Sequence, residues 1–362
     1  LDTLNRKLAE SDRGATEDPN SYVLVEQSLR ALCCFCMKNP DTARKVGALH
    51  GVDSIIQVLR QRVTIGKHAE AEACITIRFL MFDEENRAQF GESGGISILC
   101  DVLRQHLRVL SNCEDMDFMQ SQLHILNCLL ALSNAMFANA ENKSLAFGID
   151  AVEIVSSVIQ EFRSSEQVIE VSVRCLRNLG DALRMHAAAE NSVRHQLDTF
   201  LNAQMMALKA FPDCRNIVEH SLIALGLLAE DYARDMHRFQ VEPVIEVVRM
   251  HFMEDPAIRT LADQVLDLVH KRKGSLKSTA RSARSELKAP PIPPSSKEKE
   301  KEKDKKLNRR NSDQTLVDQA NSPSGSSGIG VGLVPRNATF SSADSYMEPL
   351  NRDNKEGSDM NR

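Results

Sequence analysis

Three cysteines close together in the sequence are the residues whose types and spacing could do chemistry. They lie in Cys33-Cys34-Phe35-Cys36, where Cys33 and Cys36 have the C-x-x-C spacing of many metal and thiol-redox sites. A zinc site needs further Cys or His ligands, usually from a second such pair, and the sequence contains no second C-x-x-C. The motif also lies inside the apolar run 29–37. We therefore predict that these cysteines belong to a hydrophobic core and hold no metal.

The other residues that could carry catalysis form no motif. The ten His are scattered and include no H-E-x-x-H pair. Gly328-Ile-Gly-Val-Gly332 resembles part of a phosphate-binding loop, but no predicted strand precedes it and no predicted helix follows it. No nucleophile elbow, kinase motif or P-loop occurs. The sequence therefore predicts a protein that has no catalytic residues and no cofactor and is not an enzyme.

The composition indicates which elements would position any functional side chain. Hydrophobic residues make up 42% of the chain, aromatic residues only 4%, and Trp is absent, which favours packed helices. All nine Cys lie before residue 271, so we expect free thiols in a reducing compartment and a cytoplasmic location. No apolar run reaches the roughly 18 residues of a membrane-spanning helix. Because the chain begins at Leu1 rather than Met, we expect a fragment of a longer protein.

Charge divides the chain into an acidic body and a basic tail. Residues 271–362 hold 19 Lys and Arg against 12 Asp and Glu, which leaves 26 basic and 38 acidic residues for 1–270. The tail is rich in Ser, Lys, Pro, Gly and Asn, and it has too few large apolar residues to offset its chain entropy by burial. We therefore predict a flexible or partial leading segment at 1–20, a folded body at 21–270 and a disordered tail at 271–362.

A pattern of apolar runs separated by short polar breaks recurs through the body. In each unit a small residue opens a helix after a short polar segment. These opening residues are Gly51, Gly95, Ala151 and Pro243, at spacings of 44, 56 and 92 residues, of which the last is two steps of 46. Repeats built from two or three helices have periods of roughly 40–47 residues. Extra residues around 107–120 explain the longer step.

The second unit contains the residues that resemble a known family. They are Glu85-Asn86-Arg87, Phe90-Gly91 and Gly94-Gly95-Ile96, and this segment is similar to the armadillo repeat, whose short first helix ends in a Gly pair. Ala131-Leu-Ser-Asn134 and Cys175-Leu-Arg-Asn178 resemble the third helix of that repeat. The resemblance implies an all-α, right-handed superhelical solenoid of about five repeats. The last two units lack the Gly pair, so HEAT repeats remain an alternative there.

The resemblance also implies where a partner would bind. Third helices of armadillo stacks line a concave groove, and an Asn there holds the backbone of a bound segment; Asn134 and Asn178 match that position. At helical spacing Arg174 and Asp181 share a face with Asn178, and Leu130 and Phe137 share one with Asn134. We expect replacement of both Asn residues by Ala to weaken binding while stability stays nearly unchanged. The importin-α pattern adds a Trp one turn before each Asn, where this chain has Leu130 and Arg174, which disfavours a groove for basic import signals.

The tail contains short linear motifs. Ser312 follows Arg309-Arg-Asn, a sequence that basophilic kinases accept, so Ser312 is a candidate phosphosite. The stretch 288–294 resembles a polyproline ligand of SH3 domains, with Lys288, Pro291 and Pro294 as its main contacts, although a stiff linker has the same composition. Basic runs at 271–273 and 303–310 would suit nuclear localisation. Without interleaved aromatic residues they do not predict nucleic-acid binding.

Together these features predict a scaffold or adaptor that binds a protein partner in the groove of a helical solenoid. Two alternatives are a nuclear transport carrier and a regulatory module of a larger enzymatic or cytoskeletal protein that begins before Leu1.

Overall fold

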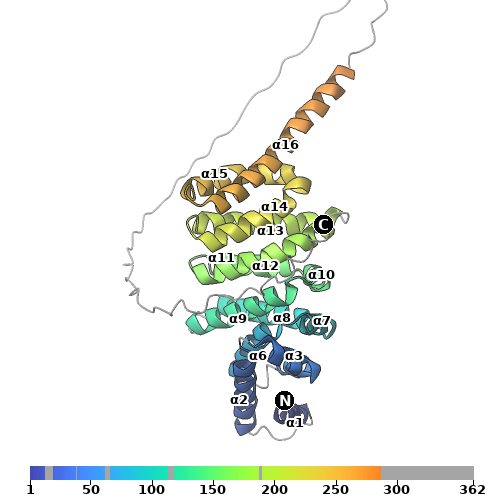
Figure 1. Ribbon diagram of the computed structural model, residues 1–362, viewed down its shortest axis with the longest axis vertical. Coiled ribbons are helices and arrows are strands. Elements are labelled where there is room, and N and C mark those ends of the chain that lie inside the picture. Colours follow the sequence, from blue (N-terminus) through green and yellow to red (C-terminus); the bar gives the residue numbers. More distant parts are fainter. Residues whose placement is uncertain (13–18, 38, 62–65, 113–117, 187–189, 287–362) are drawn as a thin grey trace, which may run out of the picture. The chain divides into compact units, whose positions relative to one another are not determined.

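The computed structural model describes residues 1–12, 19–37, 39–61, 66–112, 118–186 and 190–286, and these residues form helices without any strand. The helices are α1 (Asp2–Asp12), α2 (Pro19–Cys36), α3 (Pro40–Ala48), α4 (Gly51–Arg60), α6 (Lys67–Leu80), α7 (Glu84–Glu92), α8 (Gly95–Asn112), α9 (Phe118–Met136), α10 (Ala140–Gly148), α11 (Ala151–Glu161), α12 (Glu166–Met185), α13 (Glu190–Ala210), α14 (Arg215–Arg238), α15 (Val241–His251) and α16 (Pro256–Glu286). The predicted all-α class is confirmed for the described residues. Figure 1 shows the helices packed against one another in chain order.

A unit of one short and two longer helices recurs along the chain. Its first helix has 9 residues each time, in α3, α7 and α10, and the next two helices follow as α4 and α6, α8 and α9, or α11 and α12. The third helices lie side by side, because α6 packs on α9, α9 on α12, α12 on α14, and α14 on α16. Beyond α12 the pattern changes: α13 is a single helix of 21 residues, and α14 contains non-helical backbone at Tyr232.

The start of each short helix is fixed by its own sequence. An Asn or Asp at the N-cap accepts a hydrogen bond from the backbone N–H three residues later: Asn39 from Thr42, Asp83 from Asn86, and Asn139 from Asn142. Such a cap satisfies one of the amide groups that the first helical turn leaves unpaired. The polar breaks that separate the apolar runs are therefore helix starts.

The junction between the first and second helices uses left-handed backbone at one residue in each unit. The residues are His50, Gly94, Asp150 and Gln240, with φ between 55° and 79°. Only Gly94 is a glycine, so the Gly pair of the second unit does not recur although the backbone conformation does. The predicted helix starts at Gly51, Gly95 and Ala151 are confirmed. The backbone conformation before each start is kept even where the glycines of the sequence pattern are not.

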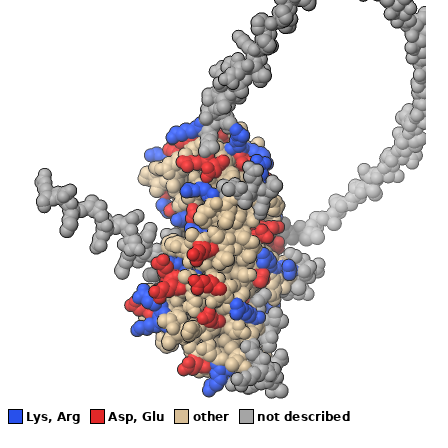
Figure 2. Space-filling view, turned by 90° about the vertical axis from the view of Figure 1, so that its right-hand side faces the viewer, with Lys and Arg blue, Asp and Glu red and all other residues tan. Residues whose placement is uncertain are grey.

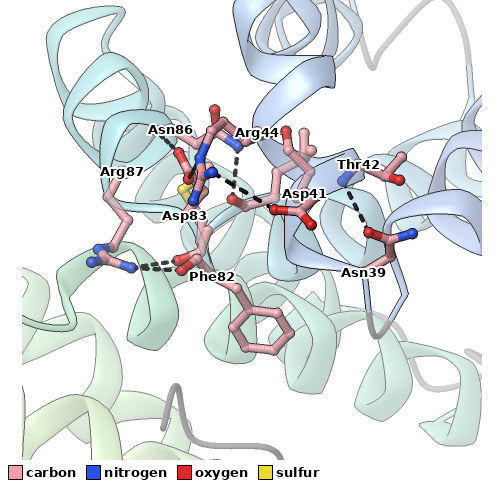
Figure 3. A network of polar contacts seen from close by, with 11 residues as sticks. Asn39, Asp41, Thr42, Arg44, Phe82, Asp83, Asn86 and Arg87 are labelled. Carbon is pink, nitrogen blue, oxygen red and sulfur yellow. Dashed lines mark hydrogen bonds and ion pairs between the residues drawn. The ribbon is translucent and has the colours of Figure 1, made fainter. Parts of the chain in front are cut away.

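Two buried asparagines join consecutive units. Asn86 Nδ2 donates to the carbonyls of Ala43 and Leu80 at 3.0 Å each, and Asn142 Nδ2 donates to those of Arg87 and Ala135 at 2.8 Å each. We call these contacts the asparagine clamps. Figure 3 shows the first, flanked by Arg44, whose Nε donates to Asp83 Oδ2 at 3.0 Å. Each clamp fixes the register of a short helix against the preceding unit. Leaving one of these buried carbonyls without its donor would lower the free energy of unfolding by about 1–3 kcal/mol.

Both ends of the described helices extend beyond the predicted boundaries. Within the segment 1–20, predicted to be flexible or partial, α1 forms and buries Leu4 and Leu8, which lie one turn apart and pack towards α2 and α4. At the other end α16 continues past residue 270 to Glu286. Ser312, Lys288, Pro291 and Pro294 lie outside the described residues.

None of the helices that the structure describes is long and apolar enough to cross a membrane.

Candidate functional site

The predicted groove residues lie on α9 and α12, which pack side by side. Asn134 is only 7% exposed. Its Nδ2 donates to the carbonyl of Arg78 in α6 at 3.0 Å, and its Oδ1 accepts from Arg174 Nη2 at 3.3 Å. Asn134 thus bridges the third helices of three units, and one of the two hydrogens of its amide is used by the fold.

Asn178 has a similar role one helix further along. Its Nδ2 donates to the carbonyl of Ser133 in α9 at 3.1 Å, while Arg174 Nε donates to Ser133 Oγ at 3.0 Å. The structure therefore brings Asn134, Arg174 and Asn178 together around Ser133. Both amides bond to neighbouring helices and therefore hold these helices in place. The expectation that their removal leaves stability unchanged does not fit these contacts.

The remaining predicted residues separate into buried and accessible ones. Leu130 is 2% exposed, because α9 is buried on all sides from Asn127 to Met136, so Leu130 is a core residue and cannot line a groove. The side chain of Asp181 is 41% exposed and accepts a hydrogen bond from Lys143 Nζ of α10 at 2.5 Å. The ring of Phe137 is partly exposed, and the guanidinium of Arg87 lies 6.0 Å from its centroid.

Solved structures share this fold. A crystal structure described as that of an engineered protein has a TM-score of 0.56 at 12% sequence identity, covering 75% of this chain and 97% of that chain. A second engineered protein gives a TM-score of 0.54 at 14% identity, covering 74% and 98%. At such identities the likeness concerns the fold alone. No protein-family model and no curated protein matches the chain.

Accessible apolar side chains lie at the carboxyl ends of four of the packed helices. Met37, Phe82, Phe137 and Met185 each lie at or just after the carboxyl end of α2, α6, α9 or α12, and none of them is buried. We call these four residues the end row. Met37 is 42% and Met185 53% exposed, and Figure 3 shows the ring of Phe82 pointing away from the polar contacts around Asp83. Of the four, only Phe137 is predicted from the sequence as a site residue. The other three are not predicted, because a single apolar residue at a helix end is not distinctive until the helix ends are aligned.

Basic and acidic side chains alternate on the described face that Figure 2 presents. Figure 2 shows Lys and Arg interspersed with Asp and Glu on the face that it presents, with broad uncharged areas between them. Many of these charges pair locally, as Arg30 does with Glu26 and Glu72.

Burial makes several of the described thiols poor nucleophiles. Cys33 and Cys36 are buried in α2, as predicted, and burial raises the pKa of both thiols to about 11. Cys34, between them, is exposed, so the prediction that it belongs to the hydrophobic core is wrong. Burial likewise raises the pKa of Cys100 and Cys175 to about 12. Since the thiolate is the reactive form, these four residues are inert packing groups at neutral pH.

His220 of α14 gives the folded chain a distinct pH dependence. Burial, helped by the charges of Arg177 and Arg174, lowers the pKa of His220 to about 4, and Arg177 Nη1 lies 3.2 Å from His220 Nδ1. An unfolded His titrates near 6.5, so the unfolded chain takes up this proton first as the pH falls. The free energy of unfolding should therefore decrease between pH 6.5 and 4, by up to about 3 kcal/mol from this residue, with no further loss below pH 4.

The variant His220→Gln should lose this part of the pH dependence, because Gln can accept the Arg177 hydrogen bond without titrating. We expect urea denaturation at pH 7 and pH 4.5 to show a smaller decrease in stability for the variant than for the unchanged chain. Equal decreases would mean that His220 is protonated in the folded state as readily as in the unfolded one.

Proposed function

We propose that the described helices form an armadillo-type solenoid that binds an extended segment of a protein partner along its third helices. The solenoid assignment is supported by the recurring three-helix unit, the asparagine clamps and the left-handed junctions, which repeat at equivalent positions. Stacked units of this kind bury a shared core and present one long binding surface.

The observation that carries the proposal is the end row. Consecutive packed helices lie about 8–10 Å apart, so one accessible apolar residue at the same end of each helix produces a row with that spacing. An extended chain advances about 3.3 Å per residue, so roughly three residues of a bound segment would span each step. Aromatic residues and Met are enriched where proteins bind one another, and Phe137 also stacks near a guanidinium.

The polar contacts between the third helices support binding by the end row because they hold these helices rigidly. Asn134, Arg174 and Asn178 use hydrogen bonds to fix α6, α9 and α12 against one another. A preformed surface loses less entropy on binding than one that must be ordered by its ligand. The predicted groove residues thus contribute to this function mainly by positioning the end row.

A photo-crosslinking amino acid at Phe137 tests the proposal. Placed in the full chain and irradiated in cell extract, it should form discrete adducts with partner proteins, because a groove ligand would cover this position. The matched control carries the same amino acid at Leu145, an exposed apolar residue of α10 that is 47% accessible and is not part of the end row. Adducts from position 145 without adducts from position 137 would refute the proposed surface.

A further inference from the structure

Three buried side chains from three different helices converge between the first two complete units. They are Glu70 in the first turn of α6, His106 in α8 and His124 in α9. Each offers one ligand atom, and these three atoms all lie within 4.8 Å of one another. The spacing in the sequence is long, 36 residues from Glu70 to His106, so no local motif announces the cluster.

Burial makes this cluster unusual. Glu70, His106 and His124 are 5%, 6% and 7% exposed. A carboxylate removed from water requires a compensating positive charge close by, since an isolated buried charge is strongly unfavourable. Glu70 Oε1 lies 2.6 Å from His106 Nε2, and a proton shared by these two atoms would supply one such charge.

That proton does not account for His124. The His124 ring meets the His106 ring edge to face, with centroids 5.3 Å apart, and it forms no hydrogen bond with any residue that the structure describes. A neutral imidazole nitrogen has a lone pair that can bind a metal ion. Its ligand nitrogen is one of the three atoms that converge with Glu70 and His106.

We infer that Glu70, His106 and His124 bind one divalent transition-metal ion, with Zn²⁺ the cation that fits best. Two imidazole nitrogens and a carboxylate oxygen are a familiar zinc ligand set, whereas Mg²⁺ and Ca²⁺ prefer all-oxygen sites. The ion would neutralise Glu70 and occupy the lone pair of His124 at once.

The geometry requires only side-chain adjustment. Zn–N and Zn–O distances near 2.0–2.2 Å place tetrahedral ligand atoms about 3.3 Å apart. The distance between Glu70 Oε1 and His106 Nε2, now 2.6 Å, would increase by less than 1 Å. The ligand nitrogen of His124 now lies no more than 4.8 Å from these two atoms and would move closer to them. Three protein ligands leave the fourth position to solvent.

Such an ion would join two consecutive units. Glu70 belongs to the last helix of one unit, while His106 and His124 belong to the second and third helices of the next. Cys74 and Cys128 lie one turn further along α6 and α9 and are both buried. They provide an alternative ligand set that an experiment must distinguish from the nitrogen and oxygen ligands.

Calorimetric titration of the full chain with ZnCl₂, after removal of metals by a chelator, tests the site. We expect about one ion per chain with micromolar or tighter affinity, and no comparable binding of MgCl₂. His124→Gln should weaken zinc binding at least about tenfold. The matched control is His270→Gln, because exposed His270 lies 3.8 Å from Glu242 and represents an adventitious surface pair; it should leave the affinity unchanged.

Circular dichroism without metal would reveal whether the variant fails to fold. A second measurement, on the unchanged chain, does not depend on the variant. Co²⁺ added to the unchanged chain should give the visible d–d bands of a tetrahedral ion without a sulfur-to-cobalt charge-transfer band. The inference would be overturned if the unchanged chain bound zinc only at millimolar or weaker affinity, or if folded His124→Gln bound it equally well. Absence of the d–d bands, or a charge-transfer band from Cys74 or Cys128, would overturn it too.

Discussion

Replacing Gly91 by Ala should lower the free energy of unfolding by about 3 kcal/mol. A Cβ atom at Gly91 would lie 1.8 Å from Oδ1 and 2.9 Å from Cγ of Asn142. Asn142 cannot move aside cheaply, because its Nδ2 is held by the carbonyls of Arg87 and Ala135. The substitution would therefore expel the amide from the second asparagine clamp and leave two carbonyls without that donor.

The chain contains a matched control in the next unit. Gly148 is the last residue of α10, one position beyond the place that Gly91 occupies in α7, and a Cβ atom there meets nothing within 4 Å. Gly148→Ala should therefore be neutral or stabilise by up to about 1 kcal/mol through helix propensity. Urea denaturation of both variants measures the difference, and equal stabilities would show that the clamp does not form.

The double replacement of Asn134 and Asn178 by Ala should lower the free energy of unfolding by about 3 kcal/mol. Asn134 supplies the donor for the Arg78 carbonyl and an acceptor for Arg174, and Asn178 supplies a donor for the Ser133 carbonyl. The two effects are coupled through Ser133 and Arg174, so they need not add.

Thermal and urea denaturation would be compared with Asn202→Ala, which replaces an exposed Asn of α13. This control gains the same helix propensity without losing these bonds, so it isolates the contribution of the bridging amides. If the double variant matched Asn202→Ala in stability, the amides would be free for a ligand, as the sequence alone suggests.

The sequence predicts the helices well because their starts are encoded locally. Asx residues cap the short helices, and α4, α8 and α11 begin at the predicted Gly51, Gly95 and Ala151. α15 begins at Val241, two residues before the predicted Pro243. This start is harder to predict because Gln240, which precedes it, takes the left-handed conformation although it is not a glycine.

The site residues are less predictable because their roles depend on register between helices. Asn134 matches a groove position in the sequence, yet its amide bonds to a carbonyl 56 residues earlier. Leu130 shares a helical face with Phe137 by spacing, but α9 has helices on several sides and buries Leu130. The convergence of Glu70, His106 and His124 likewise depends on how three helices pack, which no single segment encodes.

At the third junction the structure describes a polar contact of a different kind, made by Gln196 of α13. There Gln196 Nε2 reaches the Phe147 carbonyl at 3.4 Å and Asp150 Oδ1 at 3.1 Å, while its buried Oε1 has no partner among the described residues. In a chain whose units contact only their neighbours, cooperativity is transmitted one interface at a time. We therefore expect a substitution at one junction, such as the one where Gln196 lies, to destabilise mainly the units on either side of it.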